Sequence, residues 1–309
     1  MSRKRRTLLS EDELKLATEF TYVTSDQEAF DLFFEECLLK SLRPHTLKYY
    51  REQFNAIKRP IVTMTARDVK SLIKEMQDNG LKVTTINSRL RAIRSLFNFL
   101  HKNKHIKTNP MANIKLLKER KKAVKSLSDK QVKALFDLCN KRTFVGVRDY
   151  TILMLFIDTG IRLNELAGIQ VADVQGESIL IRQTKTYFER LLPISKKMQE
   201  QLDIYIRIRG KANTEKLFIN QDGDELKPRS VQNRLAHYAK RSRIEGVRVS
   251  CHTLRHTYAR MFIQSGGSAF HLQTTLGHTS MEITKRYVNL FAKDIADSHK
   301  KHSPLNKIF

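Results

Sequence analysis

The chain has 309 residues, 40% of them hydrophobic, so it is long enough to form two folded domains. Its 57 Lys and Arg residues against 32 Asp and Glu residues give a formal net charge of +25, which indicates a polyanionic partner. Nucleic acid is favoured over an anionic membrane, because the basic residues run along the whole chain and are not gathered beside one apolar helix.

Several classes of protein are disfavoured. The sequence has no run of about 18 apolar residues, and no long apolar stretch follows its basic first residues, so neither a membrane span nor a secretory signal is expected. Cys37, Cys139 and Cys251 lie far apart and suggest neither a disulfide framework nor a metal-binding pair. We therefore expect a reducing, cytoplasmic location, associated with the nucleoid.

The N-terminal part predicts a basic tail over residues 1–24 and a helical domain over residues 25–112. Apolar side chains at helical spacing, proline starts and capping residues predict four helices: 26–40, Pro44 to about Pro60, Thr65 to Asn79, and 84–102. The last helix carries Arg89, Arg91, Arg94 and Lys102 on its polar face. This basic face suits binding to the DNA backbone, although solvation alone would also account for it.

A polar, basic stretch over residues 113–127 is typical of an exposed linker. Ser128 and Gln131 then form a capping box at the start of a new helix. These features predict a second domain over residues 128–292, followed by a C-terminal segment over residues 293–309.

The second domain is predicted to mix helices with a small sheet. Its most apolar segment, residues 149–159, indicates a buried helix that ends at Gly160. Two strands are predicted over 178–182 and 189–194, joined by a turn over 183–188. Further helices are predicted over 195–208, 229–242, 253–265, 269–276 and 280–290. The fold class is therefore mainly α, in two domains, with a small antiparallel β-sheet.

Two common kinds of site are absent from the sequence pattern. It contains neither GxxxxGK[ST] nor GxGxxG, so chemistry on ATP is not expected. His252 and His256 have the spacing of a zinc-binding helix, but Thr253 stands where a zinc protease has glutamate, and no third ligand is evident. We therefore expect no metal site and no cofactor.

Six residues in the second domain form an ordered set: Arg162 in TGIRLNEL, Lys185 on the hairpin turn, His252 and Arg255 in HTLRHT, His278 in LGH, and Tyr287 in KRY. Their order and local sequence resemble the catalytic signature of the tyrosine recombinase (phage integrase) family. The helical first domain resembles the core-binding domain of that family. Because only about 25 residues precede its first helix, the resemblance is to the simple type without an arm-binding domain.

The resemblance implies a site-specific recombinase that cuts and rejoins DNA through a 3′-phosphotyrosyl intermediate and a Holliday junction, without metal or ATP. Tyr287 would be the nucleophile, and His252 is our candidate for the base that takes its proton. In the family, Lys185 would protonate the leaving 5′ oxygen and His278 would hydrogen-bond the phosphate. The two arginines are suited to binding the phosphate oxygens in bidentate fashion.

Glu165 lies one turn from Arg162 and is expected either to fix a neighbouring cation or to be an ordinary exposed carboxylate. The implied partners are double-stranded DNA with specific core sites, three further copies of the chain in a synaptic tetramer, and in some systems accessory DNA-bending proteins. No membrane partner is expected. Residues 293–309 are expected to dock on a neighbouring protomer.

Two other functions fit part of the pattern. A type IB topoisomerase uses similar chemistry as a monomer without site specificity, and a DNA-binding regulator would need no catalysis. The intact set of six residues argues against the regulator, and the LGH motif with the helical first domain argues against the topoisomerase. A chromosomal resolvase, a transposon integrase and a phage integrase all remain open, as mobile genetic elements often encode such enzymes.

Overall fold

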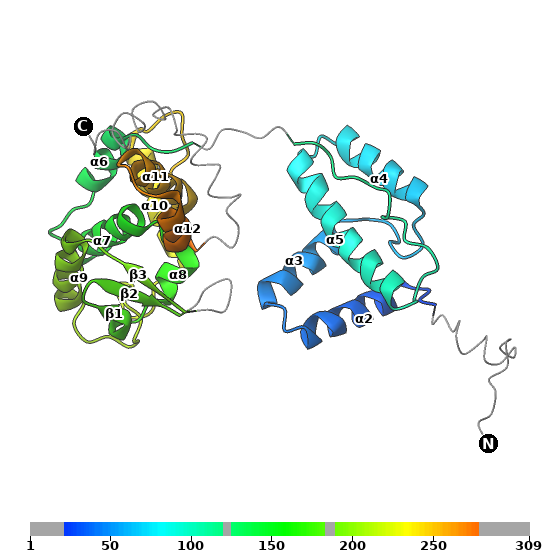
Figure 1. Cartoon of the computed structure of the whole chain (residues 1–309), viewed down its shortest axis with the longest axis horizontal. Helices are drawn as coiled ribbons and strands as arrows, with labels where there is room; N and C mark the ends of the chain where they lie inside the picture. The colour runs from blue at the N-terminus through cyan, green and yellow to red at the C-terminus, as the bar shows by residue number, and fades with distance from the viewer. Residues whose placement is uncertain (1–21, 120–124, 183–188, 278–309) are drawn as a thin grey trace, which may run out of the picture. The chain divides into compact units, whose positions relative to one another are not determined.

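The computed structural model describes residues 22–119, 125–182 and 189–277 of the protein. The chain forms two compact units, Met1–Lys121 and Lys122–Phe309 (Figure 1). The expected fold class is confirmed, since both units are mainly helical and the second contains a three-stranded antiparallel sheet. The predicted hairpin turn and the helix predicted over 280–290 lie outside the described residues. Within the described part, no helix has both the length and the apolar character needed to span a membrane.

The first unit is built around its longest described helix. Its described helices are α2 (Asp26–Leu39), α3 (Pro44–Asn55), α4 (Ala66–Asp78) and α5 (Val83–Lys102). Helix α5 packs against each of the other three, as Figure 1 shows. The sequence predicted the starts of these helices closely because the starts carry strong signals, such as Pro44 in the first turn of α3 and the capping box of Thr65 and Asp68 in α4. The predicted end of α3 near Pro60 is wrong, since this helix ends at Asn55.

The segment that leaves the first unit is held by a buried asparagine on α5. The side-chain amide of Asn87 donates to the Leu117 carbonyl at 3.0 Å and to Glu119 Oε1 at 2.7 Å, and its oxygen accepts the Leu117 amide at 2.9 Å. Ile114, which lies in the stretch predicted as a linker, is buried in the core of this unit. Arg94 of the predicted basic face donates to the Ile114 carbonyl at 2.5 Å, so it also holds this segment.

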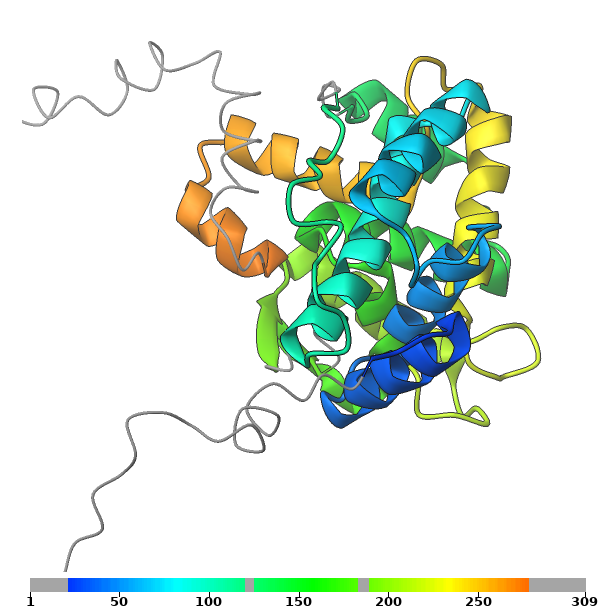
Figure 2. The ribbon, with the colours of Figure 1, turned by 90° about the vertical axis from the view of Figure 1, so that its right-hand side faces the viewer.

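The second unit combines helices with a small sheet. In chain order its described elements are α6 (Asp129–Asp137), α7 (Phe144–Thr159), α8 (Leu163–Gly168), a 3-10 turn (Val171–Asp173), β1 (Val174–Gln175), β2 (Ser178–Ile181), β3 (Arg190–Pro193), α9 (Lys196–Arg209), α10 (Pro228–Ser242), α11 (Cys251–Gln264) and α12 (Ala269–Leu276). The strand order is β1-β2-β3, and Ile179 pairs with Leu192 across the central ladder. In the turned view of Figure 2, α11 and α12 are the orange helices joined by a short turn.

Four elements of the second unit differ from the prediction. Helix α7 begins at Phe144, five residues before the predicted start, because the Thr143 hydroxyl accepts the amide of Gly146 and caps an earlier turn. Helix α11 begins at Cys251, because Ser250 caps the amide of Thr253. The short elements α8 and β1 were not predicted, since six and two residues show no clear periodicity.

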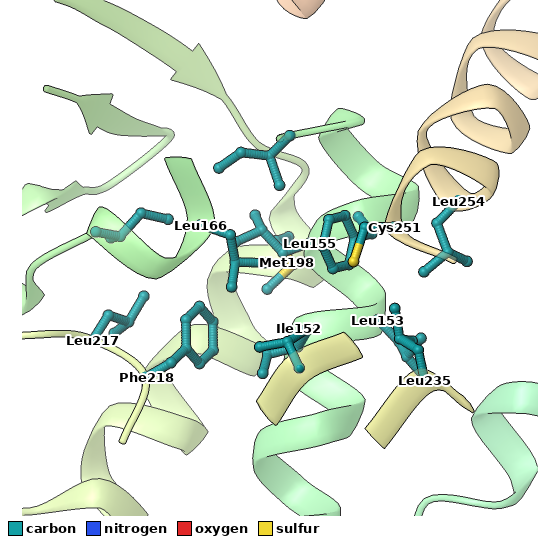
Figure 3. Packing of buried hydrophobic residues seen from close by; sticks show 14 of the residues in the cluster. Ile152, Leu153, Leu155, Leu166, Met198, Leu217, Phe218, Leu235, Cys251 and Leu254 are labelled. Atoms are coloured by element: carbon teal, nitrogen blue, oxygen red, sulfur yellow. The ribbon is translucent and has the colours of Figure 1, made fainter. Parts of the chain in front are cut away.

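Helix α7 lies at the centre of the second unit, between α9 and α11. Figure 3 shows Ile152, Leu153 and Leu155 of α7 in this core, which also includes Met198 of α9 and Leu254 of α11. Because α7 is covered on several sides, its sequence is a nearly continuous apolar run and not an amphipathic stripe.

The backbone of Leu127, just before α6, is hydrogen-bonded to two side chains of α11. Its amide donates to Thr257 Oγ1 at 2.9 Å, and its carbonyl accepts from Arg260 Nη2 at 2.9 Å. Thr257 has no solvent exposure, and its hydroxyl donates in turn to the Thr253 carbonyl at 2.8 Å. The first residues of the described second unit are therefore tied to the helix that carries the HTLRHT motif.

We expect Thr257→Val to lower the free energy of unfolding by about 1–3 kcal/mol, because the buried amide of Leu127 would lose its acceptor without any change in shape. Urea unfolding of the full chain, followed by circular dichroism, measures this change. Thr274→Val is the control, because among the described residues the exposed hydroxyl of Thr274 bonds only to the Phe270 carbonyl of its own helix. Its loss should change stability by less than about 0.5 kcal/mol. Equal effects of the two substitutions would contradict the assigned role of Thr257.

Candidate active site

The site begins where α7 ends. Gly160 has a φ of +62°, a left-handed conformation that glycine adopts at little cost. A Cβ at this position would lie 2.4 Å from a ring carbon of Tyr258 on α11, so the close approach of this helix also requires glycine. After this turn the chain places Arg162 at the N-cap of α8.

Glu165 is a buried carboxylate between two arginines. Its side chain is 2% exposed. Its Oε1 accepts from Nη1 of Arg162 at 2.9 Å and from Nη1 of Arg190 at 3.1 Å. Its Oε2 accepts from Nη2 of Arg190 at 2.9 Å and from the backbone amide of Arg162 at 3.1 Å. Burial alone would raise the pKa of Glu165, but the hydrogen bonds and charges of Arg190 and Arg162 outweigh it and lower the pKa below its ordinary value.

Arg255 joins the ends of two helices. It lies on α11 and is buried, with 7% exposure. Its Nη1 donates to the Gly160 carbonyl at 2.6 Å, at the end of α7, and its Nη2 donates to the Leu276 carbonyl at 2.7 Å, at the end of α12. Helix C-termini leave carbonyls unpaired and carry partial negative charge, so one guanidinium satisfies both ends.

The end of α12 brings the arginines together. Nη2 of Arg162 donates to the Gly277 carbonyl at 2.9 Å, one peptide unit beyond the carbonyl that Arg255 holds. Gly277 has a φ of +60°, and a Cβ there would lie 3.2 Å from Cζ of Arg190 and 3.4 Å from Nη1 of Arg162. A concentration of positive charge therefore lies at the end of α12, immediately before His278 in the sequence.

The two histidines of HTLRHT have different environments. His252 is exposed in the first turn of α11, and Arg255 follows it three residues later. His256 is half-buried, and burial, helped by the nearby charges of His252 and Arg255, lowers the pKa of its imidazole. Within the described ranges, no three His, Cys, Asp or Glu side chains come together as a metal site would require.

The structure thus brings together Arg162, Glu165 and Arg255 among the residues predicted from sequence. Lys185, His278 and Tyr287 lie outside the described residues. Sequence reasoning missed Arg190, which contacts Glu165 directly. The available signal was weak, since a single arginine at the start of a predicted strand has many ordinary explanations.

Comparison with known proteins gives this arrangement its context. Residues 125–294 match the phage integrase family, and residues 30–104 match the N-terminal SAM-like domain of phage integrases. The chain belongs to the phage integrase family. The resemblance inferred from the sequence motifs is therefore confirmed, and the protein is an enzyme of the tyrosine recombinase type.

Individual relatives agree with this assignment. Tyrosine recombinase XerC of Thermodesulfovibrio yellowstonii is 30% identical over 285 residues, which cover 87% of this chain and 94% of that protein. Tyrosine recombinase XerD of Yersinia pestis is 27% identical over 281 residues, covering 86% of this chain and 94% of that protein.

Solved structures show the same fold at low sequence identity. The Tn1549 transposon integrase in complex with a circular intermediate DNA has a TM-score of 0.72 at 19% identity, over 88% of this chain and 98% of that chain. A lambda integrase tetramer bound to a Holliday junction has a TM-score of 0.72 at 18% identity, over 89% of this chain and 80% of that chain.

We expect Arg255→Lys to weaken the attachment of α12, because an ammonium group cannot reproduce the planar fork that reaches both helix-end carbonyls. The loss should be about 1.5–3 kcal/mol, the usual contribution of a hydrogen bond from a charged group. Hydrogen exchange of peptides from residues 269–277 should accelerate, and thermal unfolding of the full chain should occur at a lower temperature.

Arg207→Lys on the exposed face of α9 serves as the matched control, because within the part of the chain that the structure describes Arg207 bonds only to the Asp203 carbonyl of its own helix. Unchanged exchange over residues 269–277 in Arg255→Lys would show that this arginine does not hold the end of α12.

Proposed function

We propose that this recombinase carries out site-specific recombination by cutting and rejoining DNA through a transient 3′-phosphotyrosyl bond to Tyr287. The observation that carries the proposal is the convergence of Arg162 and Arg255, whose guanidiniums contact the adjacent carbonyls of Gly277 and Leu276. Two guanidiniums at one place suit a phosphodiester, whose transition state carries more negative charge than its ground state.

In the proposed cleavage step, the phenolic oxygen of Tyr287 attacks the scissile phosphorus, and the bond from phosphorus to the 5′ oxygen breaks. His252 accepts the phenolic proton, and Lys185 supplies a proton to the leaving 5′ oxygen. Arg162 and Arg255 bind the non-bridging oxygens and stabilise their growing charge, together with a hydrogen bond from His278. The exposed position of His252 in the first turn of α11 leaves it accessible to a bound DNA strand.

Rejoining reverses these steps with a different strand. A free 5′ hydroxyl attacks the phosphotyrosine, and Tyr287 leaves with its proton restored. Because the phosphotyrosyl linkage conserves the bond energy, rejoining needs no ATP. Four copies of the chain would act on two core sites and exchange the strands in pairs through a Holliday junction. The solved complexes of Tn1549 and lambda integrases with DNA support this reading, and residues 293–309 would link neighbouring protomers.

Tyr287→Phe should abolish the covalent protein–DNA adduct while leaving DNA affinity within about threefold of wild type, because only the nucleophilic oxygen is removed. The substrate is a duplex selected from a random library by its binding to this chain. The duplex is nicked near the cleavage position, so that the short fragment with the free 5′ hydroxyl dissociates after cleavage and rejoining cannot occur. The adduct is detected as a complex that survives SDS. A persistent adduct in this variant would place the nucleophile at another residue.

The same preparation separates the remaining alternatives. Plasmids that carry two copies of the selected site should recombine, whereas plasmids without the site should be neither recombined nor relaxed. Relaxation of both plasmids would favour topoisomerase activity. Binding without any adduct from the wild-type protein would favour a DNA-binding regulator.

A further inference from the structure

Arg190, the first residue of β3, holds Glu165 more firmly than Arg162 does. Its two terminal nitrogens reach both carboxylate oxygens, at 3.1 and 2.9 Å, whereas the side chain of Arg162 reaches one oxygen at 2.9 Å. Arg190 is also less accessible, with 17% of its side chain exposed against 31% for Arg162. Since the arrangement with two side-chain bonds is the stronger form of this ion pair, Arg190 contributes more than Arg162 to stabilising the carboxylate charge.

The contact between Arg190 and Glu165 affects how much positive charge Arg162 keeps. Arg162 uses one N–H on Glu165 and one on the Gly277 carbonyl. Its Nε–H and the second hydrogens of its terminal nitrogens have no partner among the residues that the structure describes. One carboxylate between two guanidiniums leaves a net positive charge. Without Arg190, Glu165 would pair with Arg162 alone and cancel the charge that attracts a phosphate.

Gly277, at the end of α12, lies close to both Arg162 and Arg190. A Cβ at Gly277 would lie 3.2 Å from both Cζ and Nη1 of Arg190, so the Arg190 guanidinium lies in the space that a side chain at this position would need. The carbonyl of the same residue accepts from Arg162. Arg190 therefore binds one of the two groups that orient Arg162, the carboxylate of Glu165, and lies beside the other, the Gly277 residue.

We propose that Arg190 is a positioning residue for recombination, which satisfies Glu165 so that this carboxylate orients Arg162 without neutralising it. The inference rests on the proposed function, because it requires Arg162 to bind the scissile phosphate. Arg190 itself does not contact the DNA in this proposal. Its effect reaches the reaction through the charge and direction of the Arg162 guanidinium.

The matched control comes from a second buried carboxylate in the same unit. Asp149, 4% exposed, also lies between two arginines, with Arg148 donating to Oδ1 at 2.9 Å and Arg234 to Oδ2 at 2.6 Å. Arg234→Met therefore breaks an ion pair of the same type at a place that does not touch Arg162 or Gly277. Arg190→Met makes the equivalent change beside Glu165.

The probe is the library-selected duplex, prepared in two forms once the wild-type protein has shown which phosphate it cleaves. One form has the natural phosphodiester at that position, and the other has a methylphosphonate, which carries no charge. The rate of adduct formation is measured for the full-length protein in single turnover at saturating concentration. A charge effect on the phosphate should appear with the first substrate only, whereas a folding defect should slow both equally.

Arg190→Met should slow adduct formation on the phosphodiester by about 10–100-fold and on the methylphosphonate by less than about threefold. Arg234→Met should slow both substrates by the same factor. If Arg190→Met also slows both substrates by one common factor, the proposal is wrong. If the wild-type protein forms no adduct at all, the failure lies instead with the proposed function.

A double substitution keeps the test decisive if Arg190→Met folds poorly. Glu165→Gln with Arg190→Met removes one charge of each sign, so nothing neutralises Arg162. If Arg190→Met folds, the double variant should cleave the phosphodiester at least about tenfold faster than Arg190→Met. If Arg190→Met does not fold, the double variant should cleave it at a rate within about tenfold of the wild-type rate. A folded double variant whose cleavage rate falls below the expected rate for its case would overturn the proposal.

Discussion

The second unit depends on how two helix ends are satisfied. Helices α7 and α12 both end at glycines in the left-handed conformation, and both endings expose carbonyls inside the fold. A buried carbonyl needs a donor, because leaving it unpaired costs free energy comparable to a lost hydrogen bond. Arg255 supplies donors to both ends, and Arg162 adds one to Gly277. The requirement to satisfy these backbone groups thus gathers the two arginines to which we assign phosphate binding.

Acidic residues are few in this chain, and the second unit buries several of them beside arginines. Glu165 lies between Arg162 and Arg190, and Asp149 lies between Arg148 and Arg234. Asp173, also buried, accepts from Arg182. A buried carboxylate is favourable only when its charge is matched and its oxygens are hydrogen-bonded, so each of these groups fixes the direction of an arginine. The large positive charge of the surface is therefore accompanied by internal negative charge that orders particular guanidiniums.

Much of the fold could be predicted because its signals are local. The capping boxes at Thr65 and Ser128 and the proline at residue 44 mark helix starts within one turn of sequence. The short helix α8 and strand β1 carry no such signal, since they form only after the surrounding core has placed them. Likewise, the contact of Asn87 with Leu117 joins residues thirty positions apart, and no pattern within a helix indicates it.

The residues of the candidate site also divide into those that local motifs could predict and those that they could not. Arg162 and Arg255 could be identified from the motifs around them, and the structure shows that they share one helix end. Arg190 could not, because its importance comes from a carboxylate twenty-five residues away. The catalytic roles of all six motif residues rest on the sequence motifs and the family, and they stay predictions. Of these residues, Lys185, His278 and Tyr287 also lie outside the described part of the chain.

Arg255 also affects how diverged relatives should be interpreted. An arginine that satisfies two helix ends would be favoured by selection for folding, in addition to any selection for the proposed cleavage step. A descendant that had ceased to cut DNA would still be under pressure to retain it. Conserved arginines at these positions in a new genome would therefore indicate an intact fold, and the tyrosine would be the more informative residue for deciding whether the enzyme is still active.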